Sequence, residues 1–316
     1  MNTAATDRFA IYTSELTRQF GQLTAVDHID LRVPYGQIFG LLGANGAGKS
    51  TVIKMLTTLL SPTSGTAEVG GFDIIKSPGE VRRRIGYVSQ LVSADGALTG
   101  YENLRLSAKL YGLTKAERDE RIADALDFMG LADSAHKLVK TFSGGMIRRL
   151  ELAQAMLHRP AILFLDEPTL GLDPVARRVV WDRLLDLRHD YGMTVLITTH
   201  DMEEAETLSD QLAILHVGRV SVVGNPAELR AGLGADATMD DVFVHYAGGL
   251  IHESGTFSEV AQTRRTAHRL GLVALSDVRK IFAGCPKNFW PGTRRSGPCP
   301  RTFFRGHGPL LHTCCS

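Results

Sequence analysis

The stretch QIFGLLGANGAGKST at residues 37–51 decides the fold class of this 316-residue chain. Its first six residues form a nearly continuous apolar run, which is typical of a central strand covered on both faces. The next eight fit the pattern G-x-x-x-x-G-K-[ST], and a helix is predicted from about Lys49 to Leu60. Backbone N–H groups in such a turn wrap around phosphates, and the helix N-terminus adds its dipole. The stretch therefore predicts a phosphate-binding loop, with a point charge from Lys49 and a Mg²⁺-ligating hydroxyl from Ser50.

Strand and helix patterns alternate along much of the remaining chain. Short apolar runs of strand length occur in IGYVS at 85–89, AILFLD at 161–166, TVLITT at 194–199 and QLAILH at 211–216. This alternation predicts a mainly parallel sheet with helices on its faces. The period of two at 25–33 predicts one half-buried strand, and helical periods from about 100 to 158 predict a helical insertion.

The composition excludes several classes of protein. With 44% hydrophobic and 22% charged residues, the chain has the composition of a globular protein. It contains no apolar run of 18 residues, so we expect no transmembrane helix. Residues 1–279 contain 29 Lys/Arg against 34 Asp/Glu, a mildly acidic balance that argues against binding of nucleic acid. All four cysteines follow residue 284, and a main domain without cysteines is typical of the cytosol.

Two further segments carry chemistry. The apolar run at 161–166 leads into Asp166 and Glu167, which places carboxylates at the carboxyl edge of the sheet, where ligands bind in α/β folds. Asp166 could hold Mg²⁺, and Glu167 could orient and deprotonate a water molecule. Ser143 is a good N-cap, and the two glycines after it permit close approach of an anion. Taken alone, these segments have plain alternatives: acids that end a strand, and an ordinary capped helix.

The order of the motifs is more specific than any one of them. After the phosphate loop follow Gln90, SGGM at 143–146, LDE at 165–167, GLD at 171–173 and TTH at 198–200. Over about residues 8–245 this set resembles the nucleotide-binding subunit of an ATP-binding-cassette (ABC) transporter. The resemblance implies an α/β fold: a P-loop NTPase core of the ABC ATPase type with a mainly parallel sheet, an antiparallel β subdomain and an α-helical subdomain. A generic P-loop NTPase or kinase is the alternative, but it has no need of SGGM.

The same resemblance sets domain limits and residue roles. It implies an ATP-binding domain at 8–248, with the helical subdomain at about 92–158. Glu167 and His200 would be catalytic, and Phe20, with Tyr12 as its substitute, would stack on adenine. Ser50, Gln90 and Asp166 would hold Mg²⁺. Contacts to ATP, in part from the opposite subunit, would come from Gly43, Ala44, Asn45, Gly46, Ala47, Gly48, Lys49, Ser50, Thr51, Gln90, Ser143, Gly144, Gly145, Met146 and Asp173.

The signature departs from the family's commonest form, LSGGQ, because Phe142 and Met146 replace the leucine and the glutamine. A methionine side chain cannot donate the hydrogen bonds of an amide. The expected anion contacts of this motif therefore depend mainly on Ser143 and the backbone N–H groups of the two glycines.

The finer resemblance is to the ATPases of daunorubicin/doxorubicin-type multidrug exporters. LTGYENL at 98–104, FSGGMIRRLELAQAMLHRP at 142–160 and DEPTLGLDP at 166–174 carry it. It implies hydrolysis of ATP with Mg²⁺, a homodimer of ATPase subunits around two ATP, a separate integral membrane permease, and a location at the cytoplasmic face of the cell membrane. Export of polysaccharide, lipid-linked or haem-like cargo is one alternative. A non-transport ABC ATPase acting on ribosomes or DNA is another, disfavoured by the single cassette and the lack of heptads.

The C-terminal part has a different composition. Residues 249–271 are expected to be a C-terminal extension, which ends in the basic stretch TRRTAHRLG at 263–271. Residues 280–316 hold five Pro, five Gly and all four Cys, with six Lys/Arg and no Asp/Glu. We predict that 272–316 is disordered or an out-of-frame extension. A zinc site of these cysteines with His307 and His312 is the alternative, but the spacing lacks a C-x2-C pair.

Truncation after Gly271 tests the prediction for the C-terminal residues. Because the removed segment is expected to make no packed core, ATPase activity and the free energy of unfolding should both be unchanged. Urea unfolding and a phosphate-release assay on the two chain lengths check this, and a loss of either quantity would contradict the prediction.

Overall fold

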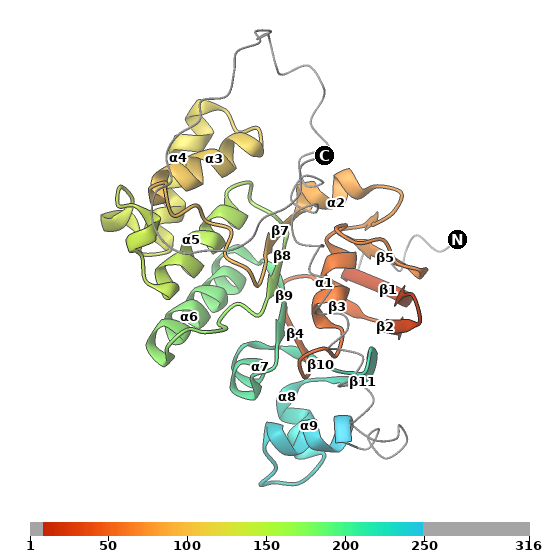
Figure 1. The fold of residues 1–316 in the computed structure, drawn as a ribbon. Helices are drawn as coiled ribbons and strands as arrows, with labels where there is room; N and C mark the ends of the chain where they lie inside the picture. The colour runs from red at the N-terminus through yellow and green to blue at the C-terminus, as the bar shows by residue number, and fades with distance from the viewer. Residues whose placement is uncertain (1–8, 249–316) are drawn as a thin grey trace, which may run out of the picture.

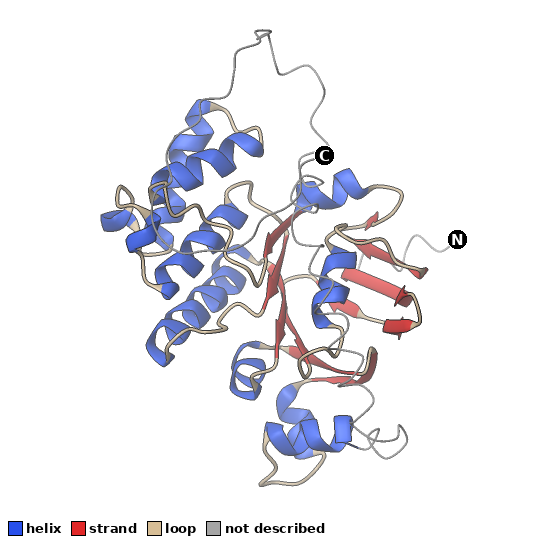
Figure 2. Cartoon of the chain, viewed as in Figure 1, coloured by secondary structure: helices blue, strands red, loops and turns tan. Residues whose placement is uncertain are grey.

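The computed structural model describes residues 9–248, so the predictions for residues 249–271 and 272–316 lie outside the described residues. A six-stranded sheet runs through the centre of the molecule (Figures 1 and 2). Its strand order is β11 (Arg219–Gly224), β10 (Gln211–His216), β4 (Ile38–Leu42), β9 (Thr194–Thr199), β8 (Ile162–Asp166) and β7 (Ile85–Val88). All neighbours are parallel except β11 and β10. The predicted mainly parallel sheet is confirmed, while β11 was not foreseen as a strand.

A second, antiparallel sheet lies beside the first. It consists of β1 (Phe9–Phe20), β2 (Leu23–Ile29), β3 (Arg32–Pro34), β5 (Ser64–Val69) and β6 (Phe72–Asp73). The single strand expected at 25–33 is wrong, because the chain forms two strands that pair with opposite halves of β1. The break follows His28, which has a φ of 49°, and lies at Asp30, whose Oδ1 accepts a hydrogen bond from the Glu15 N–H at 2.7 Å.

Helix α1 (Lys49–Leu56) lies between the two sheets and contacts both (Figure 1). Its buried face carries Val52, Ile53, Met55 and Leu56 into a core shared with Phe39 and Phe164 of the central sheet. The expected extension to Leu60 is wrong, because Thr58 adopts a left-handed φ of 64° that no helix can continue. This packing fixes the phosphate loop, which precedes α1, against the sheet edge.

The opposite face of the central sheet carries a helical layer (Figure 2). It contains α3 (Gly100–Leu110), α4 (Lys115–Phe128), α5 (Gly144–Met156) and α6 (Pro174–Tyr191). Helices α3 and α4 each begin with a complete capping box, Thr99 with Glu102 and Thr114 with Glu117. The expected helical insertion after β7 is thus present, and Ser143 is the N-cap of α5 as predicted.

Shorter helices complete the fold. They are α2 (Pro78–Arg84), the 3₁₀ turns Ala132–Ser134 and Val139–Thr141, α7 (Met202–Leu208), α8 (Pro226–Ala231) and α9 (Met239–Gly248). Helices α7, α8 and α9 close the β10–β11 end of the sheet around a third small core. In the described range, none of the helices has the length and apolar character needed to span a bilayer.

Removal of Phe164 should show how strongly the central sheet depends on its core. The side chain lies on β8, fully buried against the α1 layer. Phe164→Ala should lower the free energy of unfolding by about 3–5 kcal/mol through lost apolar burial and the cavity that remains. Urea unfolding measures this, and Val244→Ala at an exposed position of α9 is the control, with an expected change within about 0.5 kcal/mol. Equal losses for the two variants would contradict the assignment of Phe164 to the core.

Candidate active site

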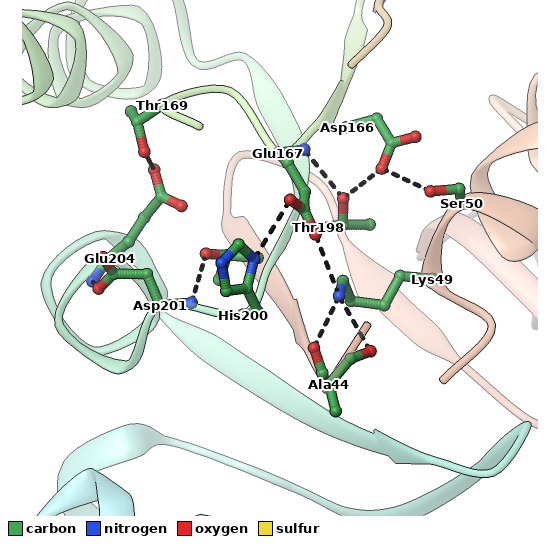
Figure 3. Close-up of polar contacts among 12 residues, drawn as sticks. Ala44, Lys49, Ser50, Asp166, Glu167, Thr169, Thr198, His200, Asp201 and Glu204 are labelled. Atoms are coloured by element: carbon green, nitrogen blue, oxygen red, sulfur yellow. Dashed lines mark hydrogen bonds and ion pairs between the residues drawn. The ribbon is translucent and has the colours of Figure 1, made fainter. Parts of the chain in front are cut away.

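Three adjacent parallel strands end at one edge of the central sheet, and each leads into a predicted site segment. After β4 comes the phosphate loop, after β8 comes Glu167, and after β9 comes His200. Because parallel strands present their carboxyl ends at the same edge, segments far apart in sequence meet there. Figure 3 shows Lys49, Glu167 and His200 pointing toward one another from these segments.

The phosphate loop at residues 43–50 needs its glycines. Gly46 has a φ of 83°, and Gly48 has a φ of 112°. A Cβ at Gly43 would lie 2.5 Å from the carbonyl oxygen of Leu215, so the loop also depends on close backbone approach. The loop curls around the ammonium of Lys49, whose Nζ donates to the carbonyl oxygens of Gly43 at 2.6 Å and Ala44 at 3.3 Å. A buried cation is therefore held inside the loop.

A chain of hydrogen bonds connects the three segments (Figure 3). The Glu167 N–H donates to Thr198 Oγ1 at 3.1 Å, and this hydroxyl donates to Asp166 Oδ1 at 2.6 Å. Ser50 Oγ donates to the same carboxylate oxygen at 3.1 Å. Hydroxyl and carboxylate oxygens are the ligands that Mg²⁺ takes in proteins, so Ser50 and Asp166 fit this ion by their chemistry. The phenol of Tyr87 lies near this charge, and burial, with a smaller effect of Asp166, raises the pKa of Tyr87.

The side chain of Glu167 is held from two sides. Its Oε1 lies 3.1 Å from Lys49 Nζ, and its Oε2 lies 3.2 Å from His200 Nδ1. Glu167 is buried, whereas His200 remains 40% exposed. The backbone of Glu167 has a φ of 49°, a left-handed conformation that costs a non-glycine residue about 1–3 kcal/mol. A strained, buried carboxylate is therefore held between a lysine and an imidazole at this edge of the sheet.

A second buried carboxylate lies behind this group. Glu204 of α7 accepts hydrogen bonds from Thr169 Oγ1 at 2.6 Å and from Trp181 Nε1 at 3.0 Å. Arg177 of α6 pairs with Asp201 at 2.6 Å. These contacts fasten the segment after Glu167 to the helix after His200, and a small pocket opens between them.

Other predicted site residues lie on separate elements. Phe20 ends β1 half-exposed, with the Arg18 guanidinium carbon 4.5 Å from its ring centre, and Gln90 is exposed after β7. Asp173 caps α6, where its carboxylate accepts from two backbone N–H groups. Ser143 is exposed at the start of α5, while Met146 packs partly against the core of the helical layer. Among the described residues, none of these five hydrogen-bonds to Lys49, Asp166 or Glu167.

Two residues of the site were not predicted from the sequence. Thr198 lies near the end of β9 and is fully buried. It is the first residue of TTH at 198–200, and a polar residue at the end of an apolar strand was the available signal. Arg148 of α5 is buried against the backbone of Asp166, Glu167 and Pro168. The sequence shows two neighbouring arginines here and does not indicate which of them points inward.

Comparison with known proteins shows the family of this chain. A profile of the ABC transporter family matches residues 26–170. The daunorubicin/doxorubicin resistance ATP-binding protein DrrA of Streptomyces peucetius is 48% identical over 75% of this chain and 71% of its own length. The Nod factor export ATP-binding protein I of Cupriavidus metallidurans is 44% identical over 66% of this chain and 69% of its own length. A solved ATP-binding cassette, a dimer in a post-hydrolysis state with ADP and Pi, has a TM-score of 0.61 and 25% identity, over 68% of this chain and 98% of that one.

The chain belongs to the ABC transporter family as an ATP-binding subunit. It is an ABC ATPase, which binds and hydrolyses ATP. Within the family it resembles the daunorubicin/doxorubicin resistance branch, as the sequence motifs predicted.

Replacing Lys49 tests the phosphate loop. Lys49→Ala removes the buried cation, so we expect the Kd for ATP to rise about tenfold or more, since each tenfold change is about 1.4 kcal/mol. Titration with a fluorescent ATP analogue measures the affinity. Lys54→Ala, an exposed lysine on the same helix, is the control and should bind as the parent does. Unchanged affinity in Lys49→Ala would contradict a phosphate contact.

Proposed function

We propose that this chain is the ATP-hydrolysing subunit of an ABC exporter, which dimerises around two ATP·Mg²⁺ and drives a separate membrane permease, for efflux of drugs or antibiotics. The observation that carries the proposal is the position of Glu167 between Lys49 and His200 at the edge of the sheet. The ATP-binding domain would span 8–248, with its helical subdomain at about 92–158. Its place would be the cytoplasmic face of the cell membrane, held there by the permease.

The proposed chemistry divides among the chain's own residues. Lys49 and the loop N–H groups hold the phosphates of ATP, and Phe20 stacks on the adenine. Glu167 accepts the proton of the attacking water, and His200 keeps the carboxylate and that water in position. Ser50, Asp166 and Gln90 would hold Mg²⁺, which supplies electrostatic stabilisation of the phosphates when bound.

The exposed surface beside the site supports the two-subunit part of the proposal. Ser143 and Gly144 face solvent, and so does Asp173 at the start of α6. Leu170 and Val175, at 51% and 76% exposure, add apolar surface to the same region. In the proposed dimer, Ser143 and its helix N-terminus contact the γ-phosphate held by the other subunit. Hydrolysis removes the group that both surfaces hold, so the two subunits separate and the movement passes to the permease.

Glu167→Gln tests the catalytic assignment. Without a general base, kcat should fall by about 10²- to 10⁴-fold while ATP binding is kept, so an ATP-bound dimer should accumulate. Phosphate release and size-exclusion chromatography with ATP measure the two effects. Adding Ser143→Arg to Glu167→Gln should retain binding but remove the dimer. Hydrolysis by Glu167→Gln would exclude Glu167 as the base, and a dimer of the double variant would exclude the proposed role of Ser143.

A second cargo class is favoured by one specific observation, the similarity to a protein named for Nod factor export. The alternative to drug export is the one that the sequence leaves open, export of polysaccharide, lipid-linked or haem-like cargo. Purification of the tagged chain from membranes, with mass spectrometry of its partners, should recover an integral membrane protein. Uptake of daunorubicin into vesicles that carry both chains would then separate drug export from these alternatives. Recovery of ribosomal proteins or DNA instead would refute the transporter.

A further inference from the structure

Arg148 is the most highly connected buried cation in the described part of the chain, and only 6% of it is exposed. Its guanidinium donates to the carbonyl oxygens of Pro168 at 2.7 Å, Asp166 at 3.2 Å and Glu167 at 3.3 Å. These are three consecutive carbonyls of the segment that holds the proposed base. The planar fork of an arginine can satisfy several acceptors at once, which a lysine cannot do in the same geometry.

The same guanidinium on α5 contacts, besides residues 166–168, the segment that follows β7. It donates to the Ser89 carbonyl oxygen at 2.8 Å and pairs with Glu151, one turn further along α5, at 3.0 Å. Glu151 in turn accepts from the Ser93 N–H at 2.5 Å and the Ser93 hydroxyl at 3.0 Å. Ser89 and Ser93 flank Gln90 and two strongly exposed apolar residues, Leu91 and Val92. Arg148 therefore holds Ser89, and its partner Glu151 holds Ser93, so that both ends of segment 89–93 are attached to α5 near the end of β8.

The backbone of Glu167 needs such support. A left-handed φ at a non-glycine residue persists only where the surrounding structure imposes it. On the N–H side, Thr198 supplies the constraint, through both its hydroxyl and its carbonyl oxygen. On the carbonyl side, the Glu167 oxygen accepts from the Arg148 guanidinium at 3.3 Å and from the Leu170 N–H at 3.3 Å. These contacts fix the backbone of Glu167, while Lys49 and His200 hold its carboxylate.

We propose that Arg148, held by Glu151, is a positioning residue for Glu167. Through it, the position of the Glu167 carboxylate depends on how α5 and segment 89–93 pack against the end of β8. This rests on the proposed function of Glu167. Arg148 contacts the backbone of the catalytic segment, so its proposed action is through Glu167. A displacement of α5 relative to the sheet would pull the guanidinium from three carbonyls and release the strained conformation, so hydrolysis would stop while ATP remained bound.

The test removes the pair as a unit, because a single apolar substitution would leave a buried charge without its partner. In the full chain, Arg148→Met with Glu151→Leu should lower kcat by about 10- to 100-fold, the effect of a misplaced catalytic group, with KM for ATP within about threefold of the parent. The variant should also accumulate an ATP-bound dimer. A kcat within twofold of the parent, or loss of the dimer, would overturn the proposal, because lost dimerisation would mean that the pair only seats α5.

Two further variants make the result decisive. Arg149→Met is the matched control, since this neighbouring arginine donates to the Met129 carbonyl at 2.7 Å, within the helical layer, and its loss should leave kcat within twofold. Arg148→Lys keeps the charge beside Glu151 but loses the fork, and it decides by the same readouts if the double variant does not fold. Glu167→Gln separates the two proposals. Hydrolysis by that variant refutes the base, whereas an inactive Glu167→Gln beside a fully active Arg148 variant refutes the positioning role alone.

Discussion

The hydrogen-bond chain from the Glu167 N–H through Thr198 and Asp166 to Ser50 is the constraint on which the site depends. It joins the ends of β8 and β9 to the first turn of α1, and all but Ser50 are buried. Loss of one member would leave a buried polar group unsatisfied, at a cost of about 1–3 kcal/mol. These groups are thus part of the hydrogen-bonded interior, and we expect replacement of Thr198 or Asp166 to lower the free energy of unfolding.

The position of the sheet explains why two layers meet at one carboxylate. Lys49 reaches Glu167 from the α1 side, whose core is shared with the antiparallel sheet. Arg148 reaches the same residue from the helical layer, which has a separate core on the opposite face. Cores of close-packed side chains move as units. A displacement of one layer against the other should therefore change contacts first in the segment that both layers touch. In this fold that segment is 166–168.

The parts that could be predicted from the sequence are those fixed by local patterns. The apolar runs of β9 and β10 have the predicted bounds, and the glycine turn and the Ser143 cap also lie where local chemistry places them. Long-range pairing decides the rest. The division of residues 25–33 into β2 and β3 depends on their pairing with β1, a strand with no strong signal of its own. Likewise, Arg148 and Arg149 differ only in which buried carbonyls lie within reach, and this is settled by packing of α5 on the sheet.

The contacts expected of Phe20, Gln90, Ser143, Met146 and Asp173 with a nucleotide stay predictions.

The distribution of functional groups also bears on cargo. In the described residues, the buried charged groups lie at the proposed ATP site or behind it, whereas buried polar residues such as Thr13, Thr17 and Asn103 lie elsewhere. The charged ones are Lys49, Arg148, Glu151, Asp166, Glu167 and Glu204. Buried charges that serve ATP chemistry have no need to change with the transported molecule. Relatives named for daunorubicin resistance and for Nod factor export accordingly resemble it to nearly the same degree. Selection of cargo is then expected in the membrane partner. Segment 89–93 exposes Leu91 and Val92 and contacts Arg148 and Glu151, so we expect a movement of that partner to reach Glu167 through this pair.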